Sequence, residues 1–188
     1  MIQIRHATIS EKEKTYNWLC LSDTTSMHMG EPDYPESPIP DWQQFQDDFE
    51  DFYYLESGRD KGSVMIIEND GEEIGCLCYA RFHLKPYRAE LDIWFKAKVY
   101  CGKGYGPQAL QRLIKYLTEK QNVKKFLIRP SEKNLRAIAA YEKAGFIRAA
   151  NKESAIDEFL NKKFTDEYGA GDYGFENTAV LTLEQYIA

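Results

Sequence analysis

Three glycines, Gly102, Gly104 and Gly106, alternate with other residues between an expected strand and an expected helix. A turn of this kind exposes successive backbone N–H groups at the positive end of the helix dipole, where they can cradle a pyrophosphate without charged side chains. Glycine meets the steric need because a Cβ atom would block the close approach of a phosphate. The spacing matches neither G-x-G-x-x-G nor G-K-[ST], so on its own it fits a purely structural turn equally well.

Two acidic residues, Glu90 and Asp92, alternate with apolar residues in the expected strand 89–96. Successive side chains of a strand point to opposite faces, so both carboxyl groups lie on one face, roughly 6–7 Å apart, with Trp94 beside them. Charged residues that face a sheet interior are uncommon unless something cationic or catalytic lies there. The pair is therefore a candidate general base or cation site, and the alternative is an exposed edge of the sheet.

A second pattern lies further along the chain, where residues 134–146 read NLRAIAAYEKAGF. Together with CGKGYG at residues 101–106, it resembles the GNAT superfamily of N-acetyltransferases. The cofactor loop of that superfamily follows Q/R-x-x-G-x-G/A, and its later helix follows N-x-x-A-x-x-x-Y-x-x-x-G-F. The later motif matches throughout, whereas Cys101 departs from the usual Gln or Arg. The resemblance is strong over residues 62–148 and weak over the first strand and helices.

The resemblance implies an α/β (α+β) fold with a central mixed, mostly antiparallel, splayed sheet flanked by helices. Pantetheine of the cosubstrate, acetyl-coenzyme A, would lie between two separating strands and pair with the first of them, as in β-strand addition. The glycine segment would hold the pyrophosphate, and Lys103 either adds a charge contact or is an ordinary solvated lysine. The residues that the resemblance assigns to the cofactor are Trp94, Phe95, Cys101, Gly102, Lys103, Gly104, Tyr105, Gly106, Pro107 and Asn134.

Acetyl transfer to an amine asks for two groups, because the acceptor must lose a proton and the departing thiolate must gain one. Tyr141 stands at the position of the family's general acid, and a phenol with a pKa of about 10 roughly matches an alkyl thiol. The alternative for Tyr141 is a core tyrosine on a helix face. The resemblance implies a direct transfer within a ternary complex.

A closer resemblance, to aminoglycoside 6′-N-acetyltransferases, rests on PSEKNLRAI followed by YEKAGF. In that family an aspartate ten residues before the Gly-Lys-Gly loop is the base, and Asp92 stands ten residues before Gly102. Asp92 is therefore favoured over Glu90 as the base, with both expected to bind the acceptor. Those enzymes usually read D-P-S where this chain has Arg129, and a cation there would oppose a polycationic acceptor.

The function expected from the resemblance is transfer of an acetyl group to a primary amine of a small molecule, with an aminoglycoside as one candidate. A second hypothesis is an α-amino acetyltransferase for protein N-termini, and a third is a catalytically idle coenzyme A-binding module. The intact Asp92 and Tyr141 argue against the third. We expect a single GNAT domain over residues 1–188, as a monomer or homodimer.

Composition limits the partners. Residues 31–60 hold ten acidic residues against one basic residue, while the whole chain has a net charge of −6, so the remainder is net basic. An acidic lobe suits a cationic acceptor, although a solvated acidic helix face is the alternative. The sequence contains no basic cluster with interleaved aromatic residues, so we expect no nucleic-acid partner. It contains no run of 18 apolar residues that would suit a membrane span, and no N-terminal apolar run typical of a signal peptide.

The four cysteines and three histidines favour neither a disulfide nor a metal site. We expect buried thiols in a reducing cytoplasm, with Cys76 and Cys78 on one face of a strand, and no metal. The expected order of elements is β-α-α-β-β-β-α-β-α-β-β. Hydrophobic periodicity and turn residues place these elements at 3–7, 10–20, 41–52, 64–67, 74–81, 89–96, 107–117, 125–129, 134–143, 146 onward and 179–183. Residues 22–40 are expected as a loop, and residues 150–177 as an irregular or partly helical insertion.

Overall fold

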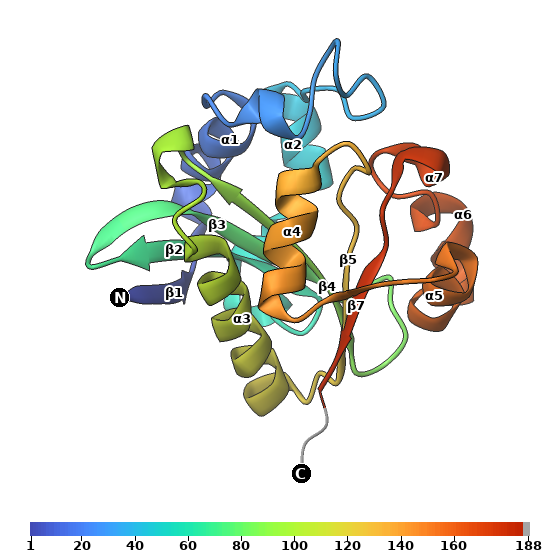
Figure 1. The fold of residues 1–188 in the computed structure, drawn as a ribbon. Helices are drawn as coiled ribbons and strands as arrows, with labels where there is room; N and C mark the ends of the chain where they lie inside the picture. The colour runs from blue at the N-terminus through green and yellow to red at the C-terminus, as the bar shows by residue number, and fades with distance from the viewer. Residues whose placement is uncertain (186–188) are drawn as a thin grey trace.

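The computed structural model describes residues 1–185 as a seven-stranded sheet with helices on both faces (Figure 1). The strands are β1 (Ile2–His6), β2 (Gly62–Asn69), β3 (Glu72–Ala80), β4 (Arg88–Phe95), β5 (Lys125–Ile128), β6 (Ile147–Arg148) and β7 (Leu181–Glu184). They lie in the order β1-β2-β3-β4-β5-β7-β6, and all neighbours are antiparallel except β4 and β5. The domain expected from the sequence ends at residue 188, and residues 186–188 lie outside the described residues.

Helices cover both faces of the sheet. They are α1 (Lys12–Cys20), α2 (Trp42–Asp48), α3 (Tyr105–Gln121), α4 (Leu135–Ala144), α5 (Lys152–Phe159), α6 (Thr165–Tyr168) and α7 (Gly174–Asn177). In Figure 1, α3 and α4 lie in front of the sheet, α1 and α2 lie at the top behind it, and α5 to α7 lie beyond β7. None of the helices in residues 1–185 combines the length and apolar character needed to cross a membrane.

An apolar stripe on α3 is buried against the sheet. Leu110, Leu113 and Leu117 are fully buried, together with Ala89 and Leu91 of β4. Complete burial of a leucine side chain stabilises a fold by about 1.5–3 kcal/mol, so this stripe fixes the helix firmly on the sheet. The start of α3, which carries the glycine segment, is thereby held next to β4.

Strand β4 presents alternate residues to two different cores. Ala89 and Leu91 face α3 and α4, whereas Trp94 packs on the opposite face with Cys76 and Cys78 of β3. Those two cysteines are buried on one face of β3, as predicted from their spacing. The alternation therefore places Glu90 and Asp92 on the Trp94 face, toward α1 and α2.

Strands β4 and β5 separate soon after they begin. Their parallel pairing joins Arg88 with Lys125, Ala89 with Phe126 and Glu90 with Leu127, and it ends there. On the other side, β4 stays paired with β3 as far as Phe95. The second half of β4 therefore has one bonded edge and one open edge, which is the splay expected from the sequence.

Residues 150–177, expected as an irregular insertion, form three short helices on the far side of β5. Ile156 and Phe159 of α5 pack with Leu127 of β5 and Val180 in a separate apolar cluster. This cluster covers the part of β5 that α3 and α4 leave open. The insertion is therefore a wall built against the second half of the sheet.

Two helix boundaries differ from the sequence prediction. The helix expected at residues 10–20 begins at Lys12, because residues 9–11 form a 3₁₀ turn in which the Glu11 carboxylate accepts a hydrogen bond from the Thr8 N–H at 2.9 Å. Asp41, the first residue of the helix expected at 41–52, caps α2 by accepting a hydrogen bond from the Gln44 N–H at 2.9 Å. The helix then ends at residue 48 rather than 52, because acidic residues in its last turn oppose the helix dipole.

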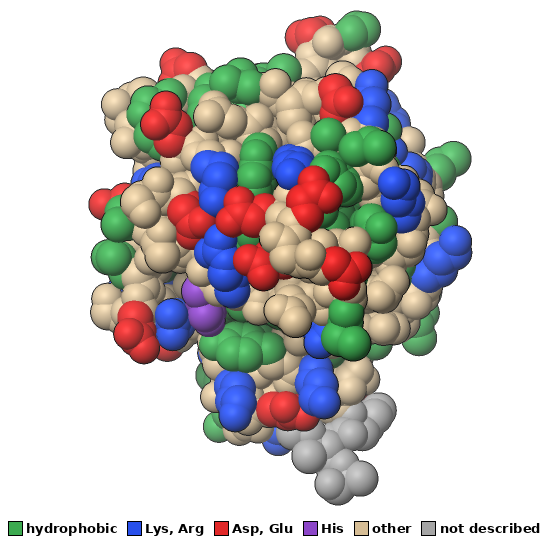
Figure 2. Space-filling view, turned by 90° about the vertical axis from the view of Figure 1, so that its left-hand side faces the viewer, with side chains coloured by type: hydrophobic (Ala, Val, Ile, Leu, Met, Phe, Trp, Pro, Cys, Tyr) green, Lys and Arg blue, Asp and Glu red, His purple; other side chains and the backbone are tan. Residues whose placement is uncertain are grey.

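Acidic and basic side chains intermingle on the side of the molecule that carries β1 and the β2–β3 hairpin (Figure 2). Arg5 pairs there with Glu11, Glu68 and Glu73, and Lys14 pairs with Glu11 and Glu73. The two basic and three acidic residues of this network are interleaved, so that each charge lies beside one of the opposite sign. The network therefore presents no patch of one sign to a partner, in contrast to the interior cavity described next.

Candidate active site

A cavity of about 1080 Å³ opens where β4 and β5 separate. Its walls come from the glycine segment and α4 on one side, and from the 22–40 loop, α2 and the insertion on the other. Most of the candidate residues line it, namely Glu90, Asp92, Trp94, Phe95, Cys101, Gly102, Gly104, Gly106, Pro107, Asn134 and Tyr141. Lys103 and Tyr105 are not among the lining residues: Lys103 is exposed outside the cavity, and Tyr105 packs against the core.

The glycine segment has the backbone shape that a phosphate cradle requires. Gly102 and Gly104 have φ angles of +74° and +79°, a region that residues with a Cβ atom rarely adopt. Helix α3 begins at Tyr105, so Pro107 is its third residue, whereas the sequence predicted that the helix would begin at Pro107. It still lies in the first turn, where backbone N–H groups have no partner within the helix and a proline costs nothing.

We expect Gly104→Val to abolish measurable acetyl-coenzyme A binding. A valine at a φ of +79° strains the turn, and its side chain would occupy space that the structure leaves open beside the N–H groups. Loss of two hydrogen bonds to a charged phosphate, each worth about 1.5–3 kcal/mol, corresponds to roughly 10²-fold or more in affinity. Calorimetric titration with coenzyme A measures this.

Gly71→Val is the matched control, because Gly71 has a φ of +85° in the β2–β3 turn, with open space around it and no part in the cavity. It should lower thermal stability similarly while leaving coenzyme A affinity unchanged. Unaltered affinity in Gly104→Val would remove the glycine segment from the cofactor site.

The open edge of β4 offers fewer backbone groups than the sequence suggested. The Lys96 N–H donates to Ile74 O of β3 at 3.0 Å, and alternation along the strand turns the backbone of Trp94 to β3 as well. Ile93 and Phe95 therefore face the opening. The Ile93 N–H donates to Asp92 Oδ1 at 2.7 Å, and Phe95 O accepts from Thr24 Oγ1 at 2.7 Å. The groups that a pantetheine could still bind are the Ile93 carbonyl and the Phe95 N–H, not those of Trp94.

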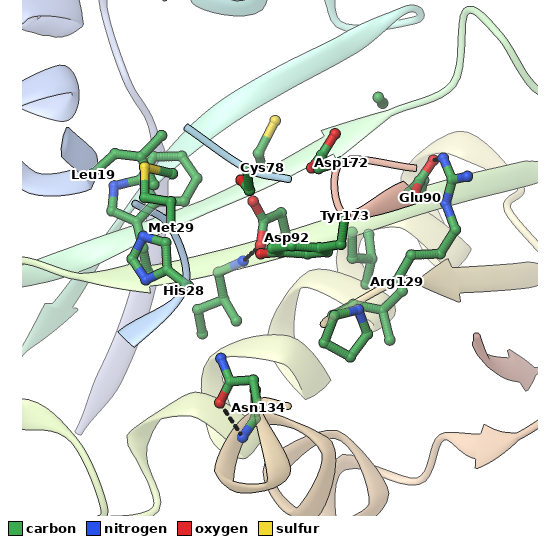
Figure 3. Close-up of a pocket in the computed structure, with 18 of the residues that line it drawn as sticks. Leu19, His28, Met29, Cys78, Glu90, Asp92, Arg129, Asn134, Asp172 and Tyr173 are labelled. Atoms are coloured by element: carbon green, nitrogen blue, oxygen red, sulfur yellow. Dashed lines mark hydrogen bonds and ion pairs between the residues drawn. The ribbon is translucent and has the colours of Figure 1, made fainter. Parts of the chain in front are cut away.

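Asn134 joins the cavity as a structural residue. Its Oδ1 accepts the Ala137 N–H at 3.1 Å and caps α4, while its Nδ2 donates to Met27 O at 3.1 Å (Figure 3). Asn134 therefore fixes the start of α4 to the 22–40 loop. Its expected role toward the cofactor is indirect in this arrangement, because both ends of the side chain already have partners.

Asp92 lies at the centre of the cavity with its carboxyl group open to it (Figure 3). Enclosure by the surrounding protein raises the pKa of Asp92 to about 6. The negative charges of Asp172 and Glu90 act in the same direction, and the hydrogen bond from the Ile93 N–H opposes them. A carboxylate with a pKa just below neutral is mostly ionised at pH 7 and is still able to take up a proton, which suits a general base.

Glu90, the other acidic residue of β4, is already paired. Arg129 holds it in a two-pronged contact, from Nε to Oε1 at 2.5 Å and from Nη2 to Oε2 at 2.9 Å, and His83 Nε2 lies 2.7 Å from Oε2. Burial opposes ionisation, but the charge of Arg129 and these hydrogen bonds outweigh it and lower the pKa of Glu90 to about 2. The acceptor-binding role expected of Glu90 therefore does not fit the structure, since its oxygens have partners.

The pairing with Glu90 also changes how Arg129 acts on a cationic acceptor. A cation at this position was expected to repel a polycationic acceptor. In the structure the Arg129 side chain is 6% exposed, and Glu90 neutralises its charge. The unpaired basic residues of the lining, Arg136 and Lys143, lie on α4, and Arg136 is close enough to Cys101 to influence its thiol. Arg136 thus brings a positive charge near the glycine segment, whereas Asp172 and Glu90 surround Asp92 with negative charge.

Tyr141 lies on α4, buried in the core and at the cavity wall. Burial, followed by the charge of Asp92, raises the pKa of Tyr141, so its phenol stays protonated at neutral pH. The pKa of Tyr141 therefore matches the pKa of an alkyl thiol less closely than that of a free phenol does. The geometry nevertheless brings a protonated phenol and an ionisable carboxyl to one cavity, as the sequence predicted.

The structure adds Asp172 and Tyr173, which sequence reasoning missed. Both enter the cavity from the insertion, and Figure 3 shows them beside Asp92. Burial and the charge of Glu90 raise the pKa of Asp172. No periodic pattern marks these residues, because they belong to an irregular segment. The one available signal was an acidic and an aromatic residue between glycines at 171 and 174.

Part of the acidic 31–60 segment also reaches the cavity. Asp47, Asp48 and Glu50 line it, whereas Asp51 pairs with Lys12 at 2.9 Å and lies elsewhere. Eight Asp and Glu residues line the cavity against three Lys and Arg residues. Within residues 1–185 no group of three or more His, Cys, Asp or Glu side chains is arranged to hold a metal ion.

Residues 2–147 match the family described as acetyltransferase (GNAT) domain, and the chain therefore belongs to the GNAT acetyltransferase family. The fold agrees, because an aminoglycoside acetyltransferase, AAC(6′)-Ib, in complex with coenzyme A superposes with a TM-score of 0.68 at 21% identity. That likeness covers 98% of this chain and 95% of the other. It confirms the splayed, mixed sheet expected from the sequence.

Other relatives carry acetyltransferase names as well. A spermidine N-acetyltransferase from Vibrio cholerae, in complex with coenzyme A and spermine, has a TM-score of 0.64 at 18% identity, over 98% of this chain and 95% of that one. A curated sequence from Bacillus subtilis subsp. natto, named probable spermine N(1)-acetyltransferase, is 34% identical over 82 residues. That match spans 41% of this chain and 54% of the relative, about half its length.

Proposed function

We propose that this protein transfers the acetyl group of acetyl-coenzyme A to a primary amine of a small molecule that carries several positive charges. The observation that carries the proposal is the enclosed, acid-lined cavity that adjoins the glycine segment at the splay of β4 and β5. Polyamines and aminoglycosides share this chemistry. The names of the relatives, spermine, spermidine and aminoglycoside acetyltransferases, support the same class.

Asp92 is the proposed base. An acceptor amine enters as an ammonium ion, attracted by Asp92 and Asp172, and gives a proton to Asp92 before it attacks the thioester carbonyl carbon. A C–N bond forms as the carbonyl electrons move to oxygen, and the C–S bond breaks when the intermediate collapses. Transfer is direct, so both substrates occupy the cavity together.

Tyr141 is the proposed acid. The thiolate that leaves with coenzyme A takes up a proton, and the Tyr141 phenol is a protonated group at the wall of the cavity. Because its pKa is raised, the phenol first donates a hydrogen bond and releases its proton only as negative charge develops on sulfur. The glycine segment and the open edge of β4 hold the cofactor for this step.

The alternative acceptor, a protein N-terminus, has one supporting observation. A ribosomal-protein α-N-acetyltransferase in complex with coenzyme A has a TM-score of 0.65 at 19% identity. A peptide acceptor asks for an open groove, whereas here the 22–40 loop and the insertion meet above Asp92, with the rings of Tyr34 and Tyr173 at 6.3 Å. The enclosed cavity favours a small molecule.

An acetylation screen tests the proposal directly. Thiol release from acetyl-coenzyme A is followed with spermine, spermidine, an aminoglycoside and a peptide with a free α-amino group. We expect kcat/KM to be highest for the acceptors with several ammonium groups. Equal or faster transfer to the peptide would contradict the proposed acceptor class, and no transfer to any amine, with coenzyme A still bound, would favour an idle module.

Asp48→Asn should raise KM for a polyamine at low salt, because Asp48 adds negative charge at the cavity wall. A partly exposed charge contributes about 0.2–1 kcal/mol, so the expected rise is up to roughly fivefold, with kcat unchanged. It should fade at high salt, since charges are screened beyond about 10 Å at 0.1 M ionic strength.

Asp51→Asn is the matched control for the neighbouring acidic residue, because Asp51 pairs with Lys12 outside the cavity. It should leave KM and its salt dependence unchanged. If both variants behave alike across the salt series, attraction by the cavity wall does not contribute to acceptor binding.

A further inference from the structure

The insertion is tied to two loops of the sheet, the loop between β3 and β4 and the loop that follows β5. Near its start, the Lys85 N–H donates to Phe159 O at 2.9 Å, and near its end the Glu132 N–H donates to Asn177 O at 2.7 Å. Between these two points residues 161–176 run along the cavity as short helical turns joined by loops. A segment of this length needs a further anchor if its side chains are to hold fixed positions.

Arg129 supplies that anchor from the end of β5. While Nε and Nη2 hold Glu90, the remaining nitrogen, Nη1, donates to Tyr168 O of α6 at 2.6 Å. The Tyr168 ring stacks on His83 with centroids 4.9 Å apart, and His83 in turn contacts Glu90. The four residues form a closed ring that joins β4, β5 and the insertion.

Asp172 and Tyr173 follow directly after this anchor. Gly171 lies against the guanidinium, since a Cβ atom there would be 3.4 Å from Arg129 Nη1. Its φ of +68° turns the chain sharply, and the next two side chains enter the cavity beside Asp92. The position of Asp172 and Tyr173 therefore depends on the contact between Arg129 and Tyr168, four residues before Asp172.

We propose that Arg129 is a positioning residue for the acceptor: it cancels the charge of Glu90 and holds residues 168–173 so that Asp172 faces Asp92. The effect of Arg129 on catalysis rests on the proposed function, whereas its effect on the insertion does not. Arg129 does not itself touch the reacting atoms. Its five N–H donors on a rigid plane serve two directions at once, which a lysine cannot do.

Stability alone does not explain this arrangement. Two desolvated charges recover their desolvation cost only with good geometry, and apolar residues of similar volume are often at least as stabilising. A buried pair that also donates to a carbonyl of an irregular segment is instead suited to fixing where that segment lies. Because Arg129 neutralises Glu90, the carboxyl groups of Asp92 and Asp172 supply the negative charge at the centre of the cavity.

The first test measures the insertion and needs no activity. Amide hydrogen exchange of residues 165–178 should be faster in Arg129→Gln than in the wild type, with α3 unchanged. Arg129→Lys should be intermediate, because an ammonium can meet Glu90 but not Tyr168 O as well. Arg148→Gln, which removes an arginine from an exposed pair with Glu132, is the control and should match the wild type. Unchanged exchange in Arg129→Gln overturns the proposal.

The second test is kinetic. Arg129→Gln should raise the acceptor KM about tenfold, the loss of one charge-assisted contact, while KM for acetyl-coenzyme A stays within about twofold. Equal changes in both constants would indicate general damage and would overturn the proposal. If the wild type acetylates no amine, the proposed function fails, and hydrogen exchange together with coenzyme A affinity still decides the role of Arg129.

The pH profile separates the two parts of the role. Asp92 is faced by groups from every neighbouring element, and these are Cys78 of β3, Glu90 of β4, Tyr141 of α4, and Asp172 and Tyr173 of the insertion. Arg129→Gln leaves Glu90 uncompensated, so the acid limb of kcat/KM should move to higher pH. The double variant Glu90→Gln/Arg129→Gln should restore the limb but keep the raised acceptor KM. If the acid limb does not move in Arg129→Gln, Arg129 does not cancel the charge of Glu90 as proposed. If the double variant also restores the acceptor KM, Arg129 does not act by holding residues 168–173.

Discussion

Asp92→Asn is expected to lower kcat/KM for any accepted amine by about 10²–10⁴-fold, the usual scale for a general base. The amide cannot take the proton that the acceptor must lose. In the wild type, activity requires the ionised carboxylate, so kcat/KM should fall as the pH drops below about 6, where Asp92 becomes protonated. Steady-state kinetics between pH 5 and 9 measure both effects, and the variant should lack this acid limb.

The same variant should be more stable than the wild type at pH 7. The raised pKa of Asp92 means that its ionisation costs folding free energy, so stability is lost as the pH rises from the ordinary value near 3.8 through about 6. Below pH 4 both states carry the proton and the difference should vanish. Thermal melts at the two pH values measure this, and a variant less stable at pH 7 would contradict the assigned environment.

Glu90→Gln distinguishes the rival base. Because Glu90 pairs with Arg129, its loss should lower stability and disturb acceptor binding, yet the acid limb should remain. A profile that loses the limb in Glu90→Gln and keeps it in Asp92→Asn would transfer the role of base to Glu90.

Tyr141→Phe is expected to lower kcat by about 10²–10⁴-fold while coenzyme A affinity stays nearly intact. The substitution removes the hydroxyl proton and keeps the ring that packs in the core. Single-turnover kinetics with an accepted amine, combined with calorimetry, separate the chemical step from binding. A kcat close to that of the wild type would reduce Tyr141 to a packing residue.

Tyr116→Phe serves as the control for this experiment. Tyr116 lies on α3 and its hydroxyl contacts His6 Nε2 at 3.0 Å, outside the cavity. The control loses a hydroxyl of the same kind, so it should change stability rather than kcat. A comparable fall in kcat for both variants would point to an effect on the fold.

The seven strands and the main helices could be predicted because their signals are local. Strict alternation in β4, the Asn69–Gly71 turn and the apolar stripe of α3 each depend on residues near one another. The turn has the left-handed backbone that an Asp-Gly pair favours, with φ of 51° at Asp70 and 85° at Gly71. The end of α2 and the first residue of α3 were misplaced because boundaries depend on weak terminal effects, such as Pro107 lying within the first turn.

The residues of the candidate site also fall into those that the sequence could predict and those that it could not. The glycine segment, Asp92 and Tyr141 could be predicted as candidate site residues because a motif marks each of them, and the structure places all three around one cavity. The pairing of Arg129 with Glu90 and the entry of Asp172 could not be predicted. These contacts join residues far apart in the sequence, and polar residues of an irregular segment follow no period that would indicate their neighbours.

The early separation of β4 and β5 gives the cofactor a part in holding the protein together. Only three residue pairs join the two strands, and beyond them β4 keeps an unpaired edge of the kind that invites aggregation. A bound pantetheine would take the place of the missing strand. Coenzyme A at 100 times its Kd would add about 2.7 kcal/mol of folding stability by mass action alone. The amount of folded enzyme in a cell would then follow the supply of its own substrate, and starvation for coenzyme A would expose the molecule to proteolysis before any change in gene expression.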